Sequence, residues 1–149
     1  MKFLHLSLSI LILGVLSACS TCENDGDLFE NRGLIIRSTF APDCAKRINP
    51  VPDELVVRSD SALSFYYSGG TSCNWGIDFE QETLLRYTSN GQCNVQVIRE
   101  VRSNGESTYL YQKNINECGD CNLGTFDEGW VVVDINDEDA EFKFRTIRN

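Results

Sequence analysis

The stretch TLLRYTSNGQCNVQVIREVRSNGESTYLYQK, residues 83–113, decides the fold class. It contains Asn-Gly pairs at 90–91 and 104–105, each between runs rich in β-branched and aromatic residues. Asn-Gly in this position favours a β-hairpin, because a type I′ turn needs positive φ at both central residues. The stretch therefore predicts three strands, over residues 83–88, 92–102 and 107–113, that form an antiparallel meander.

The middle strand of this meander has two chemically different faces. Cys93, Val95 and Val97 share one face, whereas Asn94 and Gln96 lie on the other. This period of two is typical of a strand that packs on a core on one side and contacts solvent on the other.

The flanking sequence extends the β pattern in both directions. Short strands are expected in GLIIRSTF (33–40), ELVVRS (54–59), ALSFYYS (62–68), GWVVVDI (129–135) and AEFKFRTI (140–147). Residues 41–54 carry all three prolines and are expected to form a loop pinned by Cys44, and residues 68–76 a loop with Cys73 and Trp75. No segment has a convincing helical period. We predict one all-β domain over residues 33–149, a small antiparallel β-barrel or β-sandwich of about eight strands stapled by disulfides.

The N-terminus MKFLHLSLSILILGVLSACS has the layout of a secretory signal. Lys2 precedes an apolar run over residues 3–16, and the first acidic residue is Glu23. The run is shorter than the ~20 residues that a membrane-spanning helix needs. A basic start, a short apolar region and a small-residue end indicate a signal peptide over residues 1–18.

The end of this segment, Leu16-Ser17-Ala18-Cys19, resembles the lipobox of bacterial lipoproteins. The resemblance covers only the signal and the first mature residue. It implies cleavage before Cys19 and a diacylglyceryl thioether on its sulfur, so this covalent lipid is the only cofactor-like group expected. Several acyl chains on one residue give a stable membrane anchor. Residues 19–32 are then a lipidated N-terminus and an acidic tether.

The resemblance also bears on where the protein resides. In the best-known sorting rule of that family, Asp after the lipidated cysteine retains the protein in the inner membrane. Ser20 stands there, which favours the outer membrane of a bacterial envelope. The acidic residues 23–27 are similar to short signals for surface display, but they are equally typical of a solvated tether. The membrane face is left open.

Composition excludes several functional classes. Residues 1–18 carry one lysine and no acid, so the remaining 131 residues carry 12 basic and 22 acidic side chains, a formal charge of −10. Nucleic acid is not an expected partner, because its phosphates require clustered Lys and Arg. The only histidine, His5, lies in the signal, so the mature chain has no Ser-His-Asp triad, Cys-His dyad or His-containing zinc site.

Removal of Cys19 from the count leaves an even number of cysteines: Cys22, Cys44, Cys73, Cys93, Cys118 and Cys121. In an exported chain these are candidates for up to three disulfides, with 15 possible connectivities. The C-x-x-C motif at 118–121 is read as a local disulfide, as two distant bridges or, least favoured, as a redox dithiol. A zinc site shared with Cys19 and Cys22 is not expected, since 95 residues separate the motifs and an acylated Cys19 has no thiolate. We predict no metal.

Two further groups of residues are candidates for a binding role. The acidic segment DINDED, residues 134–139, is compatible with calcium, but Asp139 stands where an EF-hand loop needs glycine, so a solvated hairpin tip is favoured. Amphipathic aromatics are frequent at binding surfaces and in cross-strand packing alike. They are Tyr66, Tyr67, Trp75, Tyr109, Tyr111 and Trp130.

These observations predict a non-enzymatic, lipid-anchored binding module whose partner is an unidentified protein or small ligand. In architecture alone, such chains resemble secreted inhibitors of lysozyme or proteases, and fold analogy is a weak guide to function. One alternative is a lipocalin-like carrier of a small apolar ligand, which needs a cavity between the inward strand faces. A less favoured alternative is a thiol-disulfide oxidoreductase that uses Cys118 and Cys121.

Overall fold

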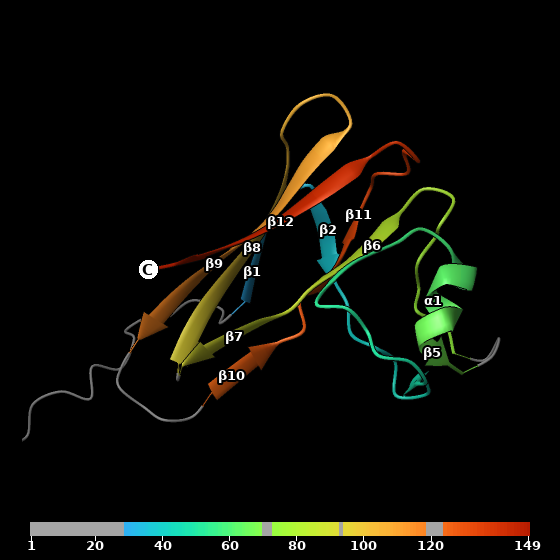
Figure 1. The fold of residues 1–149 in the computed structure, drawn as a ribbon, viewed down its shortest axis with the longest axis horizontal. Coiled ribbons are helices and arrows are strands. Elements are labelled where there is room, and N and C mark those ends of the chain that lie inside the picture. The colour runs from blue at the N-terminus through green and yellow to red at the C-terminus, as the bar shows by residue number, and fades with distance from the viewer. Residues whose placement is uncertain (1–28, 70–72, 93, 119–123) are drawn as a thin grey trace, which may run out of the picture.

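A computed structural model describes residues 29–69, 73–92, 94–118 and 124–149 (Figure 1). The described chain is predominantly β-strand, with one short helix. The strands form two four-stranded sheets and two two-stranded sheets. None of the sheets formed by these residues closes on itself, so the barrel half of the prediction is wrong.

The first four-stranded sheet, called the long sheet here, has the order β1-β8-β9-β12. Its strands are β1 (Phe29–Gly33), β8 (Asn94–Ser103), β9 (Thr108–Cys118) and β12 (Glu141–Arg148). β8 and β9 form an antiparallel hairpin, whereas β1 runs parallel to β8 and β12 runs parallel to β9. The sheet is therefore mixed, where a wholly antiparallel one was expected. β1 also lies partly within the segment 19–32 that we expected to form the tether.

The second four-stranded sheet, the short sheet, is antiparallel throughout and has the order β2-β11-β6-β4. Its strands are β2 (Ile35–Ser38), β11 (Trp130–Val133), β6 (Thr83–Tyr87) and β4 (Glu54–Val57). Two small pairs complete the fold, β7 (Ser89–Gln92) with β10 (Gly124–Asp127), and β3 (Lys46–Arg47) with β5 (Tyr67–Ser68). The short helix α1 spans Asp60–Tyr66.

The central strands of the short sheet, β6 and β11, are buried on both faces. One face meets the long sheet in a core cluster that joins Leu85, Val131 and Val133 to Val101 and Tyr111. The opposite face packs against α1 in a cluster of Val57, Leu63, Tyr67, Leu84, Trp130 and Val132. In Figure 1, α1 and β5 accordingly lie beyond β6, on the side away from the long sheet. Burial on both sides explains why LL and WVVV are continuous apolar runs.

The predicted meander is only half correct. The Asn104-Gly105 hairpin exists between β8 and β9, with a four-residue connection closed by an Asn104 N–H bond to the Thr108 carbonyl at 2.8 Å. Asn90-Gly91 instead lies inside strand β7, which pairs with β10. A β-carbon on Gly91 would sit 2.5 Å from a methyl of Val95, so glycine there serves close packing. β6 consequently belongs to the short sheet and β8 to the long one.

The segment expected to be a strand at 62–68 is mostly α1. Ser59 caps the helix by accepting the Ala62 N–H at 3.1 Å, a standard N-cap contact. Leu63 and Tyr66, three residues apart on the helix, both pack on the core cluster beneath the short sheet, and Tyr67, the first residue of β5, enters it as well. One turn of apolar spacing is too short to be told from strand alternation in the sequence.

The acidic segment 134–139 is not a hairpin tip. β11 belongs to the short sheet and β12 to the long sheet, so the segment crosses between sheets and does not join paired strands. Asp137 is held in this crossover by hydrogen bonds from the Ser107 hydroxyl at 2.7 Å and from the Asp139 N–H at 2.9 Å. β12 itself has the predicted alternation, with Phe142 and Phe144 packed on the core.

Candidate functional site

A groove lies between α1 and the chain that follows the β5 strand; we call it the α1 groove. Its volume is about 750 Å3, within the range of small-molecule sites. The helix side contributes Asp60, Ser61, Leu63, Ser64 and Tyr67, and the other side contributes Ser68, Gly69, Cys73, Asn74, Trp75 and Ile77. Serines, one carboxylate and one amide stand around a floor of aromatic and aliphatic side chains.

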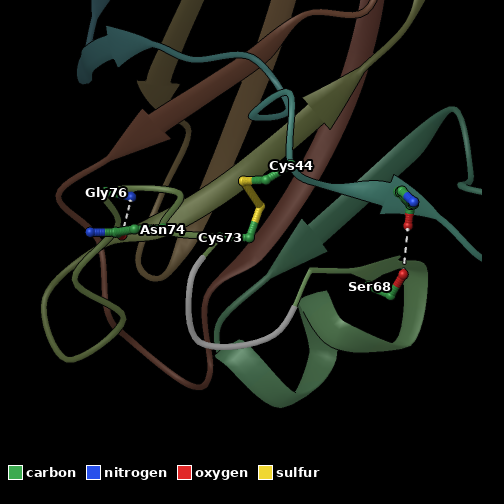
Figure 2. The surroundings of a disulfide bond; sticks show 6 residues. Cys44, Ser68, Cys73, Asn74 and Gly76 are labelled. Carbon is green, nitrogen blue, oxygen red and sulfur yellow. Dashed lines mark hydrogen bonds between the residues drawn. A yellow bond between two sulfur atoms is a disulfide. The ribbon is translucent and has the colours of Figure 1, made fainter.

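A disulfide between Cys44 and Cys73 holds one wall of the α1 groove (Figure 2). It links positions 29 residues apart, and the two Cα atoms lie 5.6 Å apart. Nearby, the β3–β5 pair joins the same two segments through Lys46 and Ser68. A cross-link of this kind restricts the unfolded chain and typically adds about 2–4 kcal/mol. The wall is thus positioned by covalent and backbone contacts before any ligand arrives.

Three aromatic rings underlie the groove. Trp75 makes edge-type contacts with Tyr67 at a centroid distance of 5.1 Å and with Trp130 at 5.6 Å. The Arg86 guanidinium lies 5.6 Å from the centre of the Trp130 ring. Such aromatic pairs contribute about 0.5–1.5 kcal/mol beyond their buried area. They fix the half-buried Trp75 ring in place, so its exposed part is a rigid component of the groove.

Substitution of Gly69 tests how closely the chain approaches the Cys44–Cys73 disulfide in this wall. A β-carbon at position 69 would lie 2.5 Å from the Cys73 β-carbon and 2.9 Å from its sulfur, so Gly69→Ala must displace the disulfide. We expect a loss of about 1–3 kcal/mol in the free energy of unfolding, measured by urea denaturation. Asp43→Ala, at an exposed residue beside Cys44, is the control and should change stability by less than about 0.5 kcal/mol. Equal stabilities of the two variants would contradict the close approach.

A second cluster of chemically active side chains is buried midway along β8 and β9 of the long sheet. Asp127 accepts hydrogen bonds from Arg99 at 2.5 Å and from the Lys113 ammonium at 2.6 Å, and its other bonds include the Gly129 N–H at 2.9 Å. These three charged side chains are at most 6% exposed. Arg99 and Lys113 are directly opposite each other on β8 and β9, so Asp127 separates two facing cations.

The pKa values in this charge cluster reflect competition between burial and pairing. Burial lowers the pKa of the Lys113 ammonium to about 8, although the Asp127 charge acts in the opposite direction. Burial alone would raise the pKa of the Asp127 carboxyl, but the hydrogen bond from Arg99 and the charge of Lys113 leave it below its ordinary value. Perturbed pKa values often mark active sites. Here the Lys113 side chain is 0% exposed, so no substrate reaches it and the cluster is structural.

The stability of the protein should depend on pH through Lys113. Its folded pKa lies below the ordinary 10.5, so the unfolded chain binds more protons between about pH 8 and about pH 10.5. Linkage then makes the Lys113 contribution to the free energy of unfolding rise with pH across this window, by up to about 1.4 kcal/mol per pH unit. Urea unfolding of the wild type and Lys113→Met measures this, because other titrations cancel in the difference. A difference that is constant between about pH 8 and about pH 10 would contradict the expectation.

The charge cluster was not predicted from the sequence, although two of its residues interrupt an apolar alternation. Arg99 continues the inward alternation of Val95 and Val97 on β8, and Lys113 lies between the inward Tyr111 and Ile115 on β9. A charged residue in an apolar register indicates a buried ion pair. The partner, Asp127, comes from β10 and has no such local signal.

The structure shows where some of the predicted site residues lie, and others are outside the described part of the chain. Of the six disulfide candidates, Cys44 and Cys73 are bonded to each other. Cys118 ends β9, and Cys19, Cys22, Cys93 and Cys121 lie outside the described residues, as does most of the 118–121 motif. Among the aromatics, Tyr67 and Trp75 line the α1 groove with Trp130 beside them, whereas Tyr109 stacks on Phe142 and Tyr111 is fully buried.

Neither a metal site nor a membrane-spanning helix is found among the described residues. No group of three or more His, Cys, Asp or Glu side chains in this part of the chain is arranged to hold a metal ion. Within the same residues, no helix is long and apolar enough to cross a bilayer. Comparison of the chain with protein-family models, with curated proteins and with solved structures finds no match. Functional inference therefore depends on the geometry of the α1 groove.

Proposed function

We propose that this chain is a lipid-anchored envelope protein that acts by binding, and that the α1 groove is its binding site on a sandwich-like β scaffold. The observation that carries the proposal is a groove of about 750 Å3 with an aromatic floor and a polar rim. Small-molecule sites combine an apolar lining with a few placed polar groups in this way. The Cys44–Cys73 disulfide preorganises the groove, which reduces the ordering cost of binding.

The proposed function is binding without catalysis. The only histidine of the chain, His5, precedes the lipobox cysteine, so the mature protein lacks the commonest general base at neutral pH. The groove lining contributes one carboxylate, Asp60, and no basic side chain among the described residues. A single carboxylate supports recognition better than it supports the paired acid and base of a hydrolase.

Neither of the two alternative functions has support from the described residues. A lipocalin-like carrier needs a cavity between inward strand faces, but the described strands form no barrel and Leu85, Val101 and Tyr111 fill the space between the sheets. The thiol oxidoreductase alternative depends on Cys121, which lies outside the described residues.

Site-specific photo-crosslinking in intact cells tests the binding proposal. A photoreactive p-benzoylphenylalanine at Ser64, on the groove rim, should yield adducts with the ligand after irradiation. The same residue at Lys143, exposed on β12, is the control position. Ser61→Trp, which fills the groove from its rim, should remove the Ser64 adducts. Identical adducts at both positions, or none at Ser64, would refute the groove as the binding site.

Lipidation of Cys19 has its own test. Cys19→Ala removes the sulfur that would carry the diacylglyceryl group, so we expect complete loss of labelled palmitate incorporation and release from the membrane fraction. Metabolic labelling followed by fractionation measures both effects. Cys22→Ser, three residues away, should retain the label. A Cys19→Ala variant that still incorporates palmitate would show that the lipobox interpretation is wrong.

A further inference from the structure

The polar groups of the α1 groove define the chemistry of its ligand. Asp60 supplies a carboxylate acceptor, and neither it nor the Asn74 amide nitrogen bonds to another described residue. The Asn74 oxygen accepts the Gly76 N–H at 2.6 Å, and Figure 2 shows its nitrogen directed away from that contact. Among the described residues, the groove therefore offers an unpaired acceptor and an unpaired donor. The hydroxyls of Ser64 and Ser68 donate to the Ser61 and Lys46 carbonyls, so from a ligand they can only accept.

The floor of the groove adds an aromatic surface. Trp75 is half-buried and is held by edge-type contacts with Tyr67 and Trp130, so it does not rearrange when a ligand arrives. The faces of aromatic rings carry negative partial charge. They attract the weakly positive C–H groups that line one face of a sugar ring. A ligand with hydroxyls at its edges and C–H groups on its face would satisfy both the rim and the floor.

Other ligand classes fit the lining less well. Phosphate or carboxylate ligands need Arg, Lys or clustered N–H donors, and no described lining residue is basic. A fatty acyl chain that covered the exposed Asp60 and Asn74 would remove them from water without a partner, and each polar group left in this way costs about 1–3 kcal/mol. A basic peptide would find a single carboxylate, Asp60, for its positive charges.

We propose that the α1 groove binds a short neutral oligosaccharide, with a sugar ring against Trp75 and its hydroxyls hydrogen-bonded to Asp60 and Asn74. The inference rests on the proposed function, because it names the ligand class of the same groove. Asp60 accepts from two vicinal hydroxyls or from one, and Asn74 donates to a hydroxyl or ring oxygen. Each contact to the charged Asp60 is stronger than one between neutral groups.

Fluorine NMR of the full lipidated chain tests the proposal. The two tryptophans are replaced by 5-fluorotryptophan, which gives one resonance each for Trp75 and Trp130, assigned with Trp75→Phe. The protein is held in micelles of a zwitterionic detergent without a sugar headgroup. The probes are chitotriose, maltotriose and β-1,4-galactotriose, with decanoate and tri-lysine as competitors from other classes.

We expect at least one trisaccharide to shift the Trp75 resonance in a saturable manner. Asp60→Asn should weaken that affinity about tenfold, since a hydrogen bond to a charged carboxylate is replaced by a weaker one to a neutral amide oxygen. Glu138→Gln, at an exposed carboxylate outside the groove, is the matched control and should bind as the wild type does. No saturable shift with any of the three sugars overturns the proposal, as do equal affinities of the wild type and Asp60→Asn.

The outcomes separate this proposal from the proposed function. If decanoate or tri-lysine shifts Trp75 and the sugars do not, the saccharide inference is refuted while the groove is retained as a binding site. If no probe shifts Trp75 and crosslinking from Ser64 yields no adduct, both proposals are refuted.

Discussion

Asp127→Asn is expected to lower the free energy of unfolding by about 3–5 kcal/mol, the usual cost of breaking a buried ion pair by removal of one partner. The substitution keeps the shape of the side chain but removes its charge. Arg99, which is 4% exposed, would then be a buried cation without its carboxylate, and Lys113, which is 0% exposed, would lose the charge that opposes the lowering of its pKa by burial. Urea denaturation followed by tryptophan fluorescence measures the loss.

Two comparisons isolate the origin of the Asp127 effect. Glu141→Gln removes a carboxylate from the exposed pair with Lys143 and should change stability by less than about 1 kcal/mol. Lys113→Met keeps one cation, Arg99, for one anion, and it should therefore destabilise less than Asp127→Asn does. If Asp127→Asn costs no more than Glu141→Gln, the three charges do not form a coupled buried cluster.

Gly129→Ala is expected to destabilise the protein by about 3–5 kcal/mol for two independent reasons. Gly129 has a φ of +57°, which disfavours any side chain. A β-carbon there would also overlap the Tyr87 carbonyl oxygen and the Lys113 ammonium, and it would lie 2.7 Å from the Lys113 ε-carbon. Backbone strain and overpacking each contribute about 1–3 kcal/mol.

Gly76→Ala is a matched control for the backbone term. Gly76 has a φ of +64°, but a β-carbon there would have no atom within 4 Å. The variant should therefore lose only about 1–2 kcal/mol, the strain of the left-handed conformation. The difference between the two glycine variants in urea denaturation measures the close approach of Gly129 to the charge cluster. Equal losses would mean that the chain relaxes around the new methyl group.

These two predictions concern one region because Gly129 and Asp127 act together. The Gly129 N–H donates to Asp127 at 2.9 Å, and the Gly129 carbonyl accepts the Tyr111 hydroxyl at 2.9 Å. The turn from β10 into β11 thus links the charge cluster to the core between the two large sheets. A change at either residue is expected to disturb the packing of both sheets.

The strands with strong alternation were predictable. Val95 and Val97 on β8, and Phe142 and Phe144 on β12, lie on the inward face as their spacing predicts. The side-chain period of a strand is a property of the local backbone, so no distant contact is needed to produce it. The apolar run at 130–133 was likewise sufficient to predict the strand β11.

Pairing between strands was not predictable from the same pattern. Asn90-Gly91 has the composition of a hairpin turn, yet it lies within β7 because residues 124–127 supply a partner strand. α1 forms because the helix directs Leu63 and Tyr66 to the cluster under the short sheet. In both cases a contact remote in sequence outweighs a local preference of about 1 kcal/mol or less.

The α1 groove was not predictable from the sequence. The six cysteines allow 15 connectivities, and only the fold brings Cys44 to within 5.6 Å of Cys73. The sequence did not distinguish Tyr67 and Trp75 from the four other aromatic residues considered for a binding role. Tertiary packing places these two in the groove.

The sequence alone therefore determined the β character of the chain, the inward faces of its longer strands and the candidate lipid attachment at Cys19. These depend on short-range periodicity and on a contiguous motif. The tertiary structure decided which strands pair, that 62–68 is mainly helix, where Asp127 neutralises Arg99 and Lys113, and that a groove forms beside α1. The physical reason is that pairing and burial are set by the free energy of contacts between segments far apart in the chain, which no local pattern encodes.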